Sequence, residues 1–285
     1  MSAIKRFLEL DRQTQKTVSI VGDSMIDEYY FINANRISPE FPIPVFVSKD
    51  TKPDIIRPGG AANVWCQFSN FNVQATLYTY CDHISAFHRA CNGLPPNLRK
   101  HTEYVPALPI KQRLYYEDHA LCRWDIEPEK YQRHDYERLL AYLDSEAADI
   151  VILSDYDKGF FDCDLQPWIT GSRFRPTIVD PKKGPVRKWK GCTIFKPNAK
   201  EALELTGSTD TITQLAKLQR ETEAEFVVIT DGGNEVYGID ASGNGFEYIP
   251  RQVVKANSVV GAGDCFVAML ALAYSHGMSI EDCVE

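Results

Sequence analysis

The 285-residue sequence has no long hydrophobic run and no excess of basic residues, and each absence excludes a class of protein. No apolar stretch approaches the roughly 20 residues that a membrane-spanning helix needs. The net charge of -8 argues against nucleic acid as the main partner, because phosphate backbones attract basic surfaces. The N-terminal segment is amphipathic and charged, unlike the apolar core of a signal peptide. We therefore expect neither a membrane nor a nucleic acid as partner.

Paired cysteines are also lacking. The eight cysteines stand singly along the chain, and none forms the C-x-x-C pair typical of zinc sites. Eight in 285 residues is too few for a small scaffold held together by disulfides. We therefore expect free thiols and a location in the reducing cytoplasm.

The residues that are present indicate a globular protein with a large core. The chain is 44% hydrophobic and 25% charged, and it contains no internal repeat, low-complexity tract or long linker. Short apolar runs that end in polar residues recur at Thr17–Val21, Ala75–Tyr80, Ile150–Leu153, Thr177–Val179, Thr193–Phe195 and Phe226–Ile229. Helical patterns lie between most of them, at Gly60–Phe71, Asp135–Ala147, Asn198–Thr206, Thr211–Thr222 and Ala262–His276. This alternation predicts an α/β fold with a mainly parallel sheet.

Polar residues gather where the predicted strands end. The five stretches are Gly22-Asp23, Ser154 to Gly159, Asp180 to Lys183, Lys196 to Asn198 and Thr230 to Gly233. The carboxyl ends of parallel strands are where open α/β sheets bind ligands. Each stretch alone is compatible with an ordinary turn, but together their Lys, Asp and Gly content favours an anionic ligand.

Two stretches break the alternation. Residues Glu28–Val47 are extended and rich in aromatics and proline, and Ile110–Glu127 alternates like a hairpin with its turn near 117–119. They fit either edge strands of the main sheet or a separate small β-sheet that covers the site as a lid, and we favour the lid. Exposed strands carrying Phe31, Tyr115 and Trp124 need a partner, so we expect a homodimer through the lid.

The segment Val259 to Phe266 leads from an irregular loop into a helix. Gly261, Ala262 and Gly263 have almost no side chain, so a ligand can approach their backbone N–H groups at the positive end of the helix dipole. Asp264 follows in the first turn. It is either a capping residue or a base that accepts a proton from a hydroxyl attacking a phosphoryl group.

Several motifs carry a family resemblance. They are the segments 21–27, 36–45, 57–64, 153–159, 180–182, 197–201 and 261–264. In this order they resemble the ribokinase-like (PfkB) carbohydrate kinases over most of the chain. The segments Arg36 to Glu40 and Ser154 to Gly159 are similar, more narrowly, to the kinase domain of bacterial D-glycero-β-D-manno-heptose-7-phosphate kinases, which often occur fused to an adenylyltransferase.

The resemblance implies a ribokinase-like three-layer sandwich, formed by residues 1–285 as one kinase domain with lid strands near 28–47 and 110–127. It implies that ATP, with Mg²⁺, phosphorylates the anomeric hydroxyl of D-glycero-D-manno-heptose 7-phosphate to the 1,7-bisphosphate, on the route to ADP-heptose and the lipopolysaccharide core. Two alternatives stay open. One is another ribokinase-like sugar or sugar-phosphate kinase, and the other is a non-catalytic protein that binds a sugar phosphate or nucleotide.

The resemblance also assigns roles to residues. Catalysis falls to Asp264 as base, with Gly261, Ala262 and Gly263 as the anion hole. The expected sugar-phosphate contacts are Asp27, Gly59, Gly60, Asn63, Lys111, Arg113 and Arg123. The expected nucleotide and phosphate contacts are Lys158, Asn198, Glu201, Thr230 and Gly232, with Glu201 also near Mg²⁺. Structural alternatives are a turn or helix cap for Asp27, a tight turn for the Gly59-Gly60 pair, a solvated surface residue for Lys158 or Glu201, and pairing of Arg113 or Arg123 with Glu117 or Asp125.

The chain departs from the family's pattern near the proposed base. Ser258, Val260 and Cys265 stand where the family usually has Asp, Thr, and Thr or Ser. These changes are expected to weaken the handling of nucleotide or metal. The chain also ends soon after Ala273, so we expect either that the end of the domain is missing or that the adenine side is open.

Overall fold

The computed structural model describes residues 2–47, 51–82, 86–117, 119–131, 136–145, 147–171, 175–250 and 260–285. Its main sheet consists of β1 (Lys16–Gly22), β6 (Val73–Asp82), β7 (Leu98–Val105), β10 (Ile150–Ser154), β11 (Thr177–Asp180), β12 (Ile194–Phe195), β13 (Phe226–Thr230), β14 (Val236–Asp240) and β15 (Gly245–Tyr248). The strand order is β15-β14-β13-β12-β11-β10-β1-β6-β7. Every neighbouring pair from β13 to β7 is parallel, and β14 and β15 are antiparallel.

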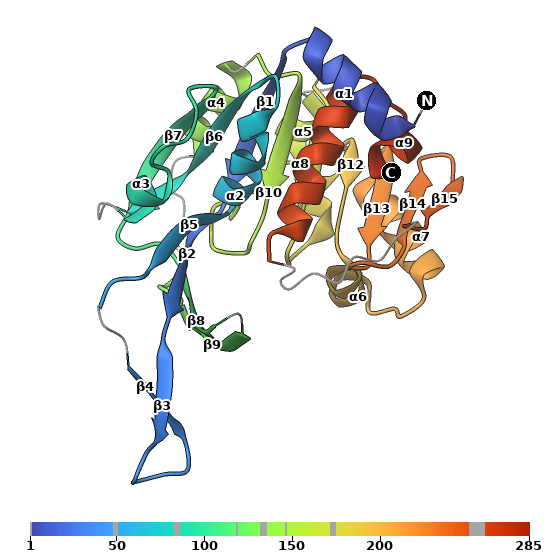
Figure 1. The fold of residues 1–285 in the computed structure, drawn as a ribbon. Helices are drawn as coiled ribbons and strands as arrows, with labels where there is room; N and C mark the ends of the chain where they lie inside the picture. The colour runs from blue at the N-terminus through green and yellow to red at the C-terminus, as the bar shows by residue number, and fades with distance from the viewer. Residues whose placement is uncertain are drawn as a thin grey trace.

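Helices cover both faces of this sheet (Figure 1). They are α1 (Ala3–Gln13), α2 (Ala61–Cys66), α3 (Ala86–Ala90), α4 (Tyr136–Ser145), α5 (Gln166–Gly171), α6 (Ala199–Thr206), α7 (Thr211–Thr222), α8 (Ala262–Ser275) and α9 (Ile280–Val284), with the 3-10 turns η1 (Gln67–Asn70) and η2 (Val186–Trp189). Helices α2 and α8 pack against each other, and both contact β1. The predicted three-layer α/β sandwich with a mainly parallel sheet is confirmed.

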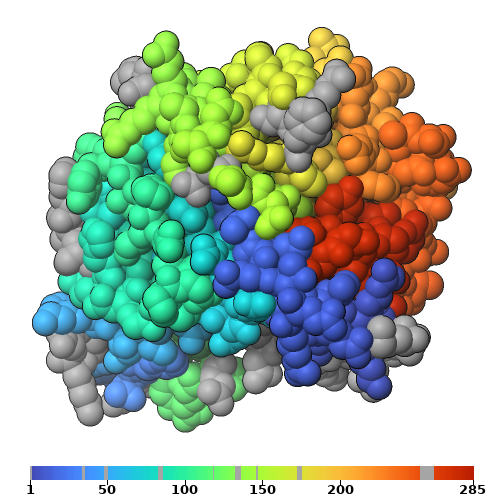
Figure 2. All heavy atoms as spheres, turned by 90° about the horizontal axis from the view of Figure 1, so that it is seen from above, coloured from blue at the N-terminus to red at the C-terminus, as the bar shows by residue number. Residues whose placement is uncertain are grey.

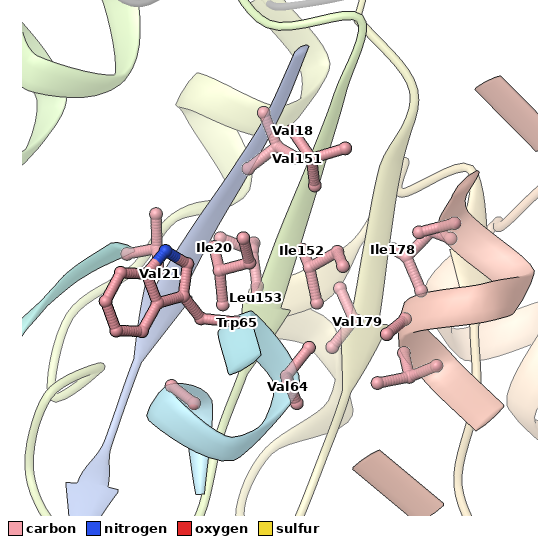
Figure 3. Packing of buried hydrophobic residues seen from close by; sticks show 14 of the residues in the cluster. Val18, Ile20, Val21, Val64, Trp65, Val151, Ile152, Leu153, Ile178 and Val179 are labelled. Atoms are coloured by element: carbon pink, nitrogen blue, oxygen red, sulfur yellow. The ribbon is translucent and has the colours of Figure 1, made fainter. Parts of the chain in front are cut away.

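The core covers both faces of the central strands, and part of it lies against the α2–α8 layer. Figure 3 shows the apolar side chains of β1, β10 and β11 beside Val64 and Trp65 of α2. These strands read as continuous apolar runs because a parallel sheet is covered on both faces. The indole N–H of Trp65 donates to the carbonyl of Ala75 over 3.0 Å, so this buried polar group is satisfied.

The predicted strands and helices are found, with additions at the sheet's edges. All six apolar runs form strands of the main sheet, and each helical pattern contains a helix, although Gly60 belongs to β5 and Ala147 lies beyond the end of α4. The edge strands β7 and β15, and β14 next to β15, were not predicted, because strands at and near the sheet's edges are partly solvated and carry polar side chains that interrupt an apolar run. Asp135, at the start of one predicted helix, lies outside the described residues.

The end of the molecule opposite the lid is closed by the N-terminal helix. Figure 2 looks onto this end and shows α1 (blue) beside the C-terminal helices (red). Ala3 packs with Ala273 and Met278, and Arg6 lies 3.3 Å from the carboxylate of Asp282. Within the described segments, no helix combines the length and apolar character needed to cross a bilayer.

The lid is a separate sheet at the carboxyl ends of the parallel strands (Figure 1). Its strands are β2 (Ser24–Phe31), β5 (Ile55–Gly60), β8 (Ile110–Tyr116) and β9 (His119–Ile126), in the order β5-β2-β8-β9. A further hairpin of β3 (Asn33–Ile37) and β4 (Pro44–Val47) extends away from the body. The prediction of a lid is confirmed, and the lid is larger than predicted because it includes β5. Asp118 of the expected hairpin turn lies outside the described residues.

Candidate active site

The start of α8 is shaped by a glycine that no other residue replaces easily. Gly261 is the N-cap and has a φ of 82°, in the left-handed region that favours glycine. A Cβ atom built there would lie 2.8 Å from the amide nitrogen of Asn63. The first backbone N–H groups of a helix have no partner within it, so this turn offers donors to the adjacent cleft. Val259, in the loop before the helix, lies outside the described residues.

Asp264 is held by two side chains rather than by the helix backbone. Its Oδ2 accepts a hydrogen bond of 2.5 Å from Asn63, and its Oδ1 accepts one from the hydroxyl of Tyr156. The α8 N-terminus has no side-chain cap, so the capping role does not account for this carboxylate. Burial raises the pKa of Asp264, while the two hydrogen bonds and the positive charges of Lys196 and Lys111 oppose the rise.

A cleft of about 290 Å³ lies between the lid and the main sheet in front of Asp264. It brings together residues from the lid, from α8 and from the ends of the parallel strands. The predicted site residues that line it are Asp264, Gly261, Gly263, Asp27, Gly60, Asn63, Lys111, Arg113, Arg123, Asn198, Glu201 and Thr230. Sequence reasoning therefore chose residues that the fold does gather, although more than 200 positions separate Asp27 from Asp264.

The lid side of the cleft is held by two ion pairs. Arg113 lies 2.5 Å from the carboxylate of Asp27, and both side chains are buried. Arg123 lies 2.6 Å from Asp125, and this pair is more exposed. Asp27 lies within strand β2, so the alternative of a turn or helix cap is wrong. Arg123 does pair with Asp125, as the structural alternative proposed.

The two glycines before α2 make room for the protein's own chain. A Cβ atom on Gly59 would lie 2.5 Å from the carboxylate of Asp27. Gly60 has a φ of 63°, and a Cβ atom there would lie 2.4 Å from the carbonyl oxygen of Asp23. Gly60 lines the cleft, whereas Gly59 does not. Because Gly59 has no side chain, the Asp27 side chain has room to reach the cleft.

Lys111 differs from the other cations of the cleft. Arg113, Arg123, Lys182 and Lys196 each have a carboxylate partner within 3 Å, whereas no such partner is found for Lys111 among the described residues. Its ammonium group lies 5.6 Å from the centre of the Tyr156 ring. Burial lowers the pKa of Lys111, and the carboxylate of Asp27 opposes this shift. Lys111 is therefore the cation best placed to meet an incoming anion.

The side of the cleft that carries the residues expected to contact a nucleotide is organised by the start of α6. Asn198 and Glu201 form a capping box, in which each side chain accepts a 2.9 Å hydrogen bond from the other residue's backbone N–H. The second carboxylate oxygen of Glu201 accepts from Lys182 over 2.9 Å. Thr230, at the end of β13, lies opposite Asn198 in an isolated parallel bridge. The capping box is therefore the local structural cause that holds these two side chains beside each other.

Five polar residues of the cleft were not selected from the sequence as site residues: Asp155, Tyr156, Asp180, Lys182 and Lys196. Lys196 is 2% exposed and lies 2.9 Å from Asp180. Burial alone would lower the pKa of Lys196, but the carboxylates of Asp180, Glu201 and Asp264 raise it, so Lys196 stays charged. These residues follow predicted strands, and that position was the signal that could have identified them.

Four predicted residues do not line the cleft. Gly59 packs against Asp27, Ala262 is exposed in the first turn of α8, and Gly232 lies in the turn after β13. Lys158 points elsewhere because its backbone N–H is bound by Asp23, and its ammonium group donates to Glu127 over 2.7 Å. In this structure Lys158 therefore links the body to the end of β9 rather than contacting a ligand in the cleft.

The residues present fit Mg²⁺ only as an ion held mostly by phosphate and water. Both oxygens of Glu201 are already engaged, and among the described residues no cluster of three or more His, Cys, Asp or Glu side chains is placed to hold a metal. Mg²⁺ commonly keeps several waters and binds through one or two carboxylates plus substrate phosphates. Glu201 would hold it indirectly, as predicted, and the ion would neutralise charge on the phosphoryl oxygens.

Comparison with known proteins places the chain in a family. The sequence profile described as "pfkB family carbohydrate kinase" matches residues 141–285, just over half of the chain. The chain belongs to the pfkB carbohydrate kinase family. The expectation of a PfkB sugar kinase is therefore confirmed at the level of the family.

Curated relatives cover most of this pfkB-family chain. The bifunctional protein HldE of Vibrio parahaemolyticus is 28% identical over 287 residues, and that of Actinobacillus pleuropneumoniae is 30% identical over 277 residues. Each match covers 93% of this chain and 57% of the relative. The chain thus spans little more than half the length of these relatives.

Solved structures show the same fold at low sequence identity. Phosphofructokinase-2 from Escherichia coli, in its tetrameric inhibited form, aligns with a TM-score of 0.75 at 19% identity, covering 94% of this chain and 90% of that one. A carbohydrate kinase from Agrobacterium tumefaciens aligns with a TM-score of 0.67 at 16% identity, covering 94% and 87%. The ribokinase-like fold is confirmed.

Proposed function

We propose that this pfkB-family protein transfers the γ-phosphoryl group of ATP to a hydroxyl of a sugar phosphate. The observation that carries the proposal is the position of Asp264, a buried carboxylate at the start of a glycine-capped helix, facing a cleft lined by five cations. Phosphoryl transfer needs little covalent chemistry from the protein beyond positioning and charge stabilisation, and this cleft offers both.

The reaction assigns a role to each side of the cleft. The sugar hydroxyl lies between the lid and Asp264, and its oxygen forms a bond to the γ-phosphorus while its proton passes to the Asp264 carboxylate. The bond between the γ-phosphorus and the bridging oxygen breaks, and ADP leaves with those electrons. The backbone N–H groups at Gly261 to Gly263 and the helix dipole stabilise charge on the transferring group.

The lid cations suit a second anionic group on the acceptor. Lys111, Arg113 and Arg123 lie on two adjacent lid strands and line the same cleft as the base. Lys111, which has no carboxylate partner in the part of the chain that the structure describes, binds the acceptor's phosphate, while Asp27, fixed by Arg113, accepts hydrogen bonds from sugar hydroxyls. These contacts favour a sugar phosphate over an unphosphorylated sugar.

The specific reaction we propose is phosphorylation of the anomeric hydroxyl of D-glycero-D-manno-heptose 7-phosphate to the 1,7-bisphosphate, in the pathway to ADP-heptose and lipopolysaccharide. The names of the two curated relatives described above, both bifunctional HldE proteins, support it, as do the segments Arg36 to Glu40 and Ser154 to Gly159. We also propose a cytoplasmic location, which suits the eight free cysteines and the use of ATP.

The test is a coupled ADP-release assay with Mg²⁺ and a panel of sugar 7-phosphates, sugar 6-phosphates and unphosphorylated hexoses. We expect turnover on heptose 7-phosphate, and none with Asp264→Asn. Turnover only on unphosphorylated hexoses would overturn the heptose assignment while leaving a sugar kinase. Binding of sugar phosphate without ADP release from any substrate would mean a non-catalytic binding protein.

We further propose a homodimer formed through the lid. Phe31 and Trp124 are 49% and 67% exposed, which leaves a small sheet with apolar side chains in solvent. Strand β9 is also the edge of the lid sheet, with exposed residues along most of its length. A second copy would cover both features.

A further inference from the structure

Tyr156 occupies a rigid position between the lid and the base. It follows β10, in a loop whose backbone N–H groups at Tyr156, Lys158 and Phe160 all donate to the carboxylate of Asp23, at 2.9, 3.1 and 3.0 Å. Asp23 is 1% exposed, so this anchor is shielded from water. The loop is therefore fixed before any ligand arrives, and so is the place of the Tyr156 ring.

The Tyr156 hydroxyl is a permanent donor to the proposed base. It donates a hydrogen bond to Oδ1 of Asp264. Burial and the nearby Asp264 carboxylate raise the pKa of Tyr156 well above its usual range, so the phenol keeps its proton at working pH and cannot itself act as the base. On the lid side, the ammonium group of Lys111 lies over the same ring.

The other oxygen of the Asp264 carboxylate is held by a second, independently oriented donor. Asn63 donates to Oδ2, and Gln67 donates to Oδ1 of Asn63 over 3.2 Å, which turns the Asn63 nitrogen toward the base. The carboxylate is thus held from two sides, by α2 and by the loop after β10. Its rotation is set by these two contacts.

We propose that Tyr156 is a positioning residue for phosphoryl transfer: its hydroxyl fixes the orientation of the Asp264 carboxylate, so that a remaining lone pair faces the acceptor hydroxyl in the cleft. The inference rests on the proposed function. It differs from a purely structural role for Tyr156, in which the hydroxyl would only help to hold the loop. The three backbone hydrogen bonds to the Asp23 carboxylate already hold the loop without the Tyr156 hydroxyl.

The proposal predicts a specific change in pH dependence. The charged and titratable groups around Asp264 are the cations Lys196 and Lys111, the carboxylates Asp180 and Glu201, the Tyr156 phenol and the Cys265 thiol. Of the groups that lower the pKa of Asp264, the two hydrogen-bond donors are Tyr156 and Asn63. Loss of the Tyr156 donor therefore raises the pKa of Asp264, and the base becomes ionised only at higher pH.

The test is Tyr156→Phe, which keeps the ring beneath Lys111 and removes only the hydroxyl. We expect kcat to fall about 10- to 100-fold, the loss typical of a hydrogen bond to a charged group. The KM for the sugar phosphate should change by less than about threefold, because the contact supports the transition state rather than ground-state binding. The acid limb of the kcat profile should move to higher pH.

Tyr274→Phe is the matched control. Tyr274 lies on the same helix as Asp264, and its hydroxyl also donates to a carboxylate, that of Glu225 at 3.4 Å, outside the cleft. This variant should leave kcat and its pH profile as in wild type. Equal profiles for wild type and Tyr156→Phe would overturn the proposal.

A second measurement separates this inference from the proposed function. The carboxylate of Asp264 can be titrated by ¹³C NMR in the wild type and in Tyr156→Phe, without turnover. A raised pKa in the variant supports the contact, and an unchanged pKa overturns it. If the titration shifts but the wild type releases no ADP from any sugar phosphate, the proposed function fails although the contact is real.

Discussion

At the scale of single residues, Asp264 decides whether the cleft is catalytic. We expect Asp264→Asn to lower turnover by at least the roughly 10²–10⁴-fold attributed to a general base. Asn is close in shape and can keep a bond to Asn63 or Tyr156, so the fold and the affinity for sugar should stay nearly unchanged. Steady-state kinetics with calorimetric sugar binding measures both. Wild-type turnover in this variant would show that Asp264 is not the base.

Asp27 is expected to affect binding more than chemistry. Asp27→Asn removes a charged acceptor from the sugar side and should weaken sugar binding by about 1.5–3 kcal/mol. The structure adds a second effect, because Arg113 would remain buried without its counter-charge, and loss of one partner of a buried pair costs roughly 3–5 kcal/mol of stability.

Asp125→Asn is the matched control for this effect on stability. It breaks the more exposed pair with Arg123, and it should cost no more than about 1 kcal/mol. Urea unfolding of the two variants tests the contrast. Equal losses would mean that the Asp27–Arg113 pair is hydrated in solution.

Asp23 should make stability depend on pH in an unusual direction. Burial, with the carboxylate of Asp155, raises its pKa from 3.8 to about 6 despite the opposing backbone donors. Between these two values the folded chain holds a proton that the unfolded chain has lost, so rising pH lowers the free energy of unfolding through this window. Relative to Asp23→Asn, the wild type should lose roughly 2 kcal/mol from pH 4 to pH 7.

Urea unfolding of wild type and Asp23→Asn across this pH range measures the Asp23 effect. A difference that stays flat with pH would show that Asp23 is already ionised at the acid end. The Asn variant cannot accept three backbone N–H groups equally well, so the loop that carries Tyr156 should loosen at every pH.

At the scale of the elements, the start of α8 depends on Gly261. Gly261→Ala puts a methyl group against Asn63 and requires a left-handed φ, so stability should fall by at least about 1 kcal/mol and turnover should fall as Asn63 shifts. Gly263→Ala is the matched comparison for stability, because nothing lies within 4 Å of its Cβ position and alanine favours a helix. Thermal unfolding should separate the two variants, and equal midpoints would contradict this account.

The lid strands show that the predicted aromatic residues do not share one face. Arg113 lies opposite Arg123, and both line the cleft, so Tyr115, two residues further along β8, points to the cleft side. Trp124 is next to Arg123 and points to the opposite side. Tyr115 also packs against Phe31, with ring centroids 5.8 Å apart.

At the scale of the whole molecule, the side chains of the lid alternate between its cleft side and its outer side. Substitutions on each side can therefore show which side of the lid forms the proposed dimer interface. If the cleft sides of two lids meet, Phe31→Ser should convert a dimer into a monomer at micromolar protein, and Trp124→Ser should leave it a dimer. If the outer sides meet, the two results are exchanged. Analytical ultracentrifugation of both variants and the wild type decides, and a monomeric wild type would remove the proposal.

The sequence by itself determined the architecture and most of the candidate site. Buried parallel strands show as continuous apolar runs, and the helices at Ala199–Thr206 and Thr211–Thr222 have local start signals in Asn198 and Asp210. These signals lie within a few residues of the element that they specify. The motif resemblance then indicated which strand ends carry the chemistry.

Only the tertiary structure decided which side chains meet. It directs Lys158 to Glu127 instead of the cleft, and it ties Asp27 to Arg113. It also brings Tyr156 to Asp264 across 108 positions of sequence. The choice of partner depends on strand order, register and burial, which bring distant residues together, and no local pattern encodes the distance between two side chains.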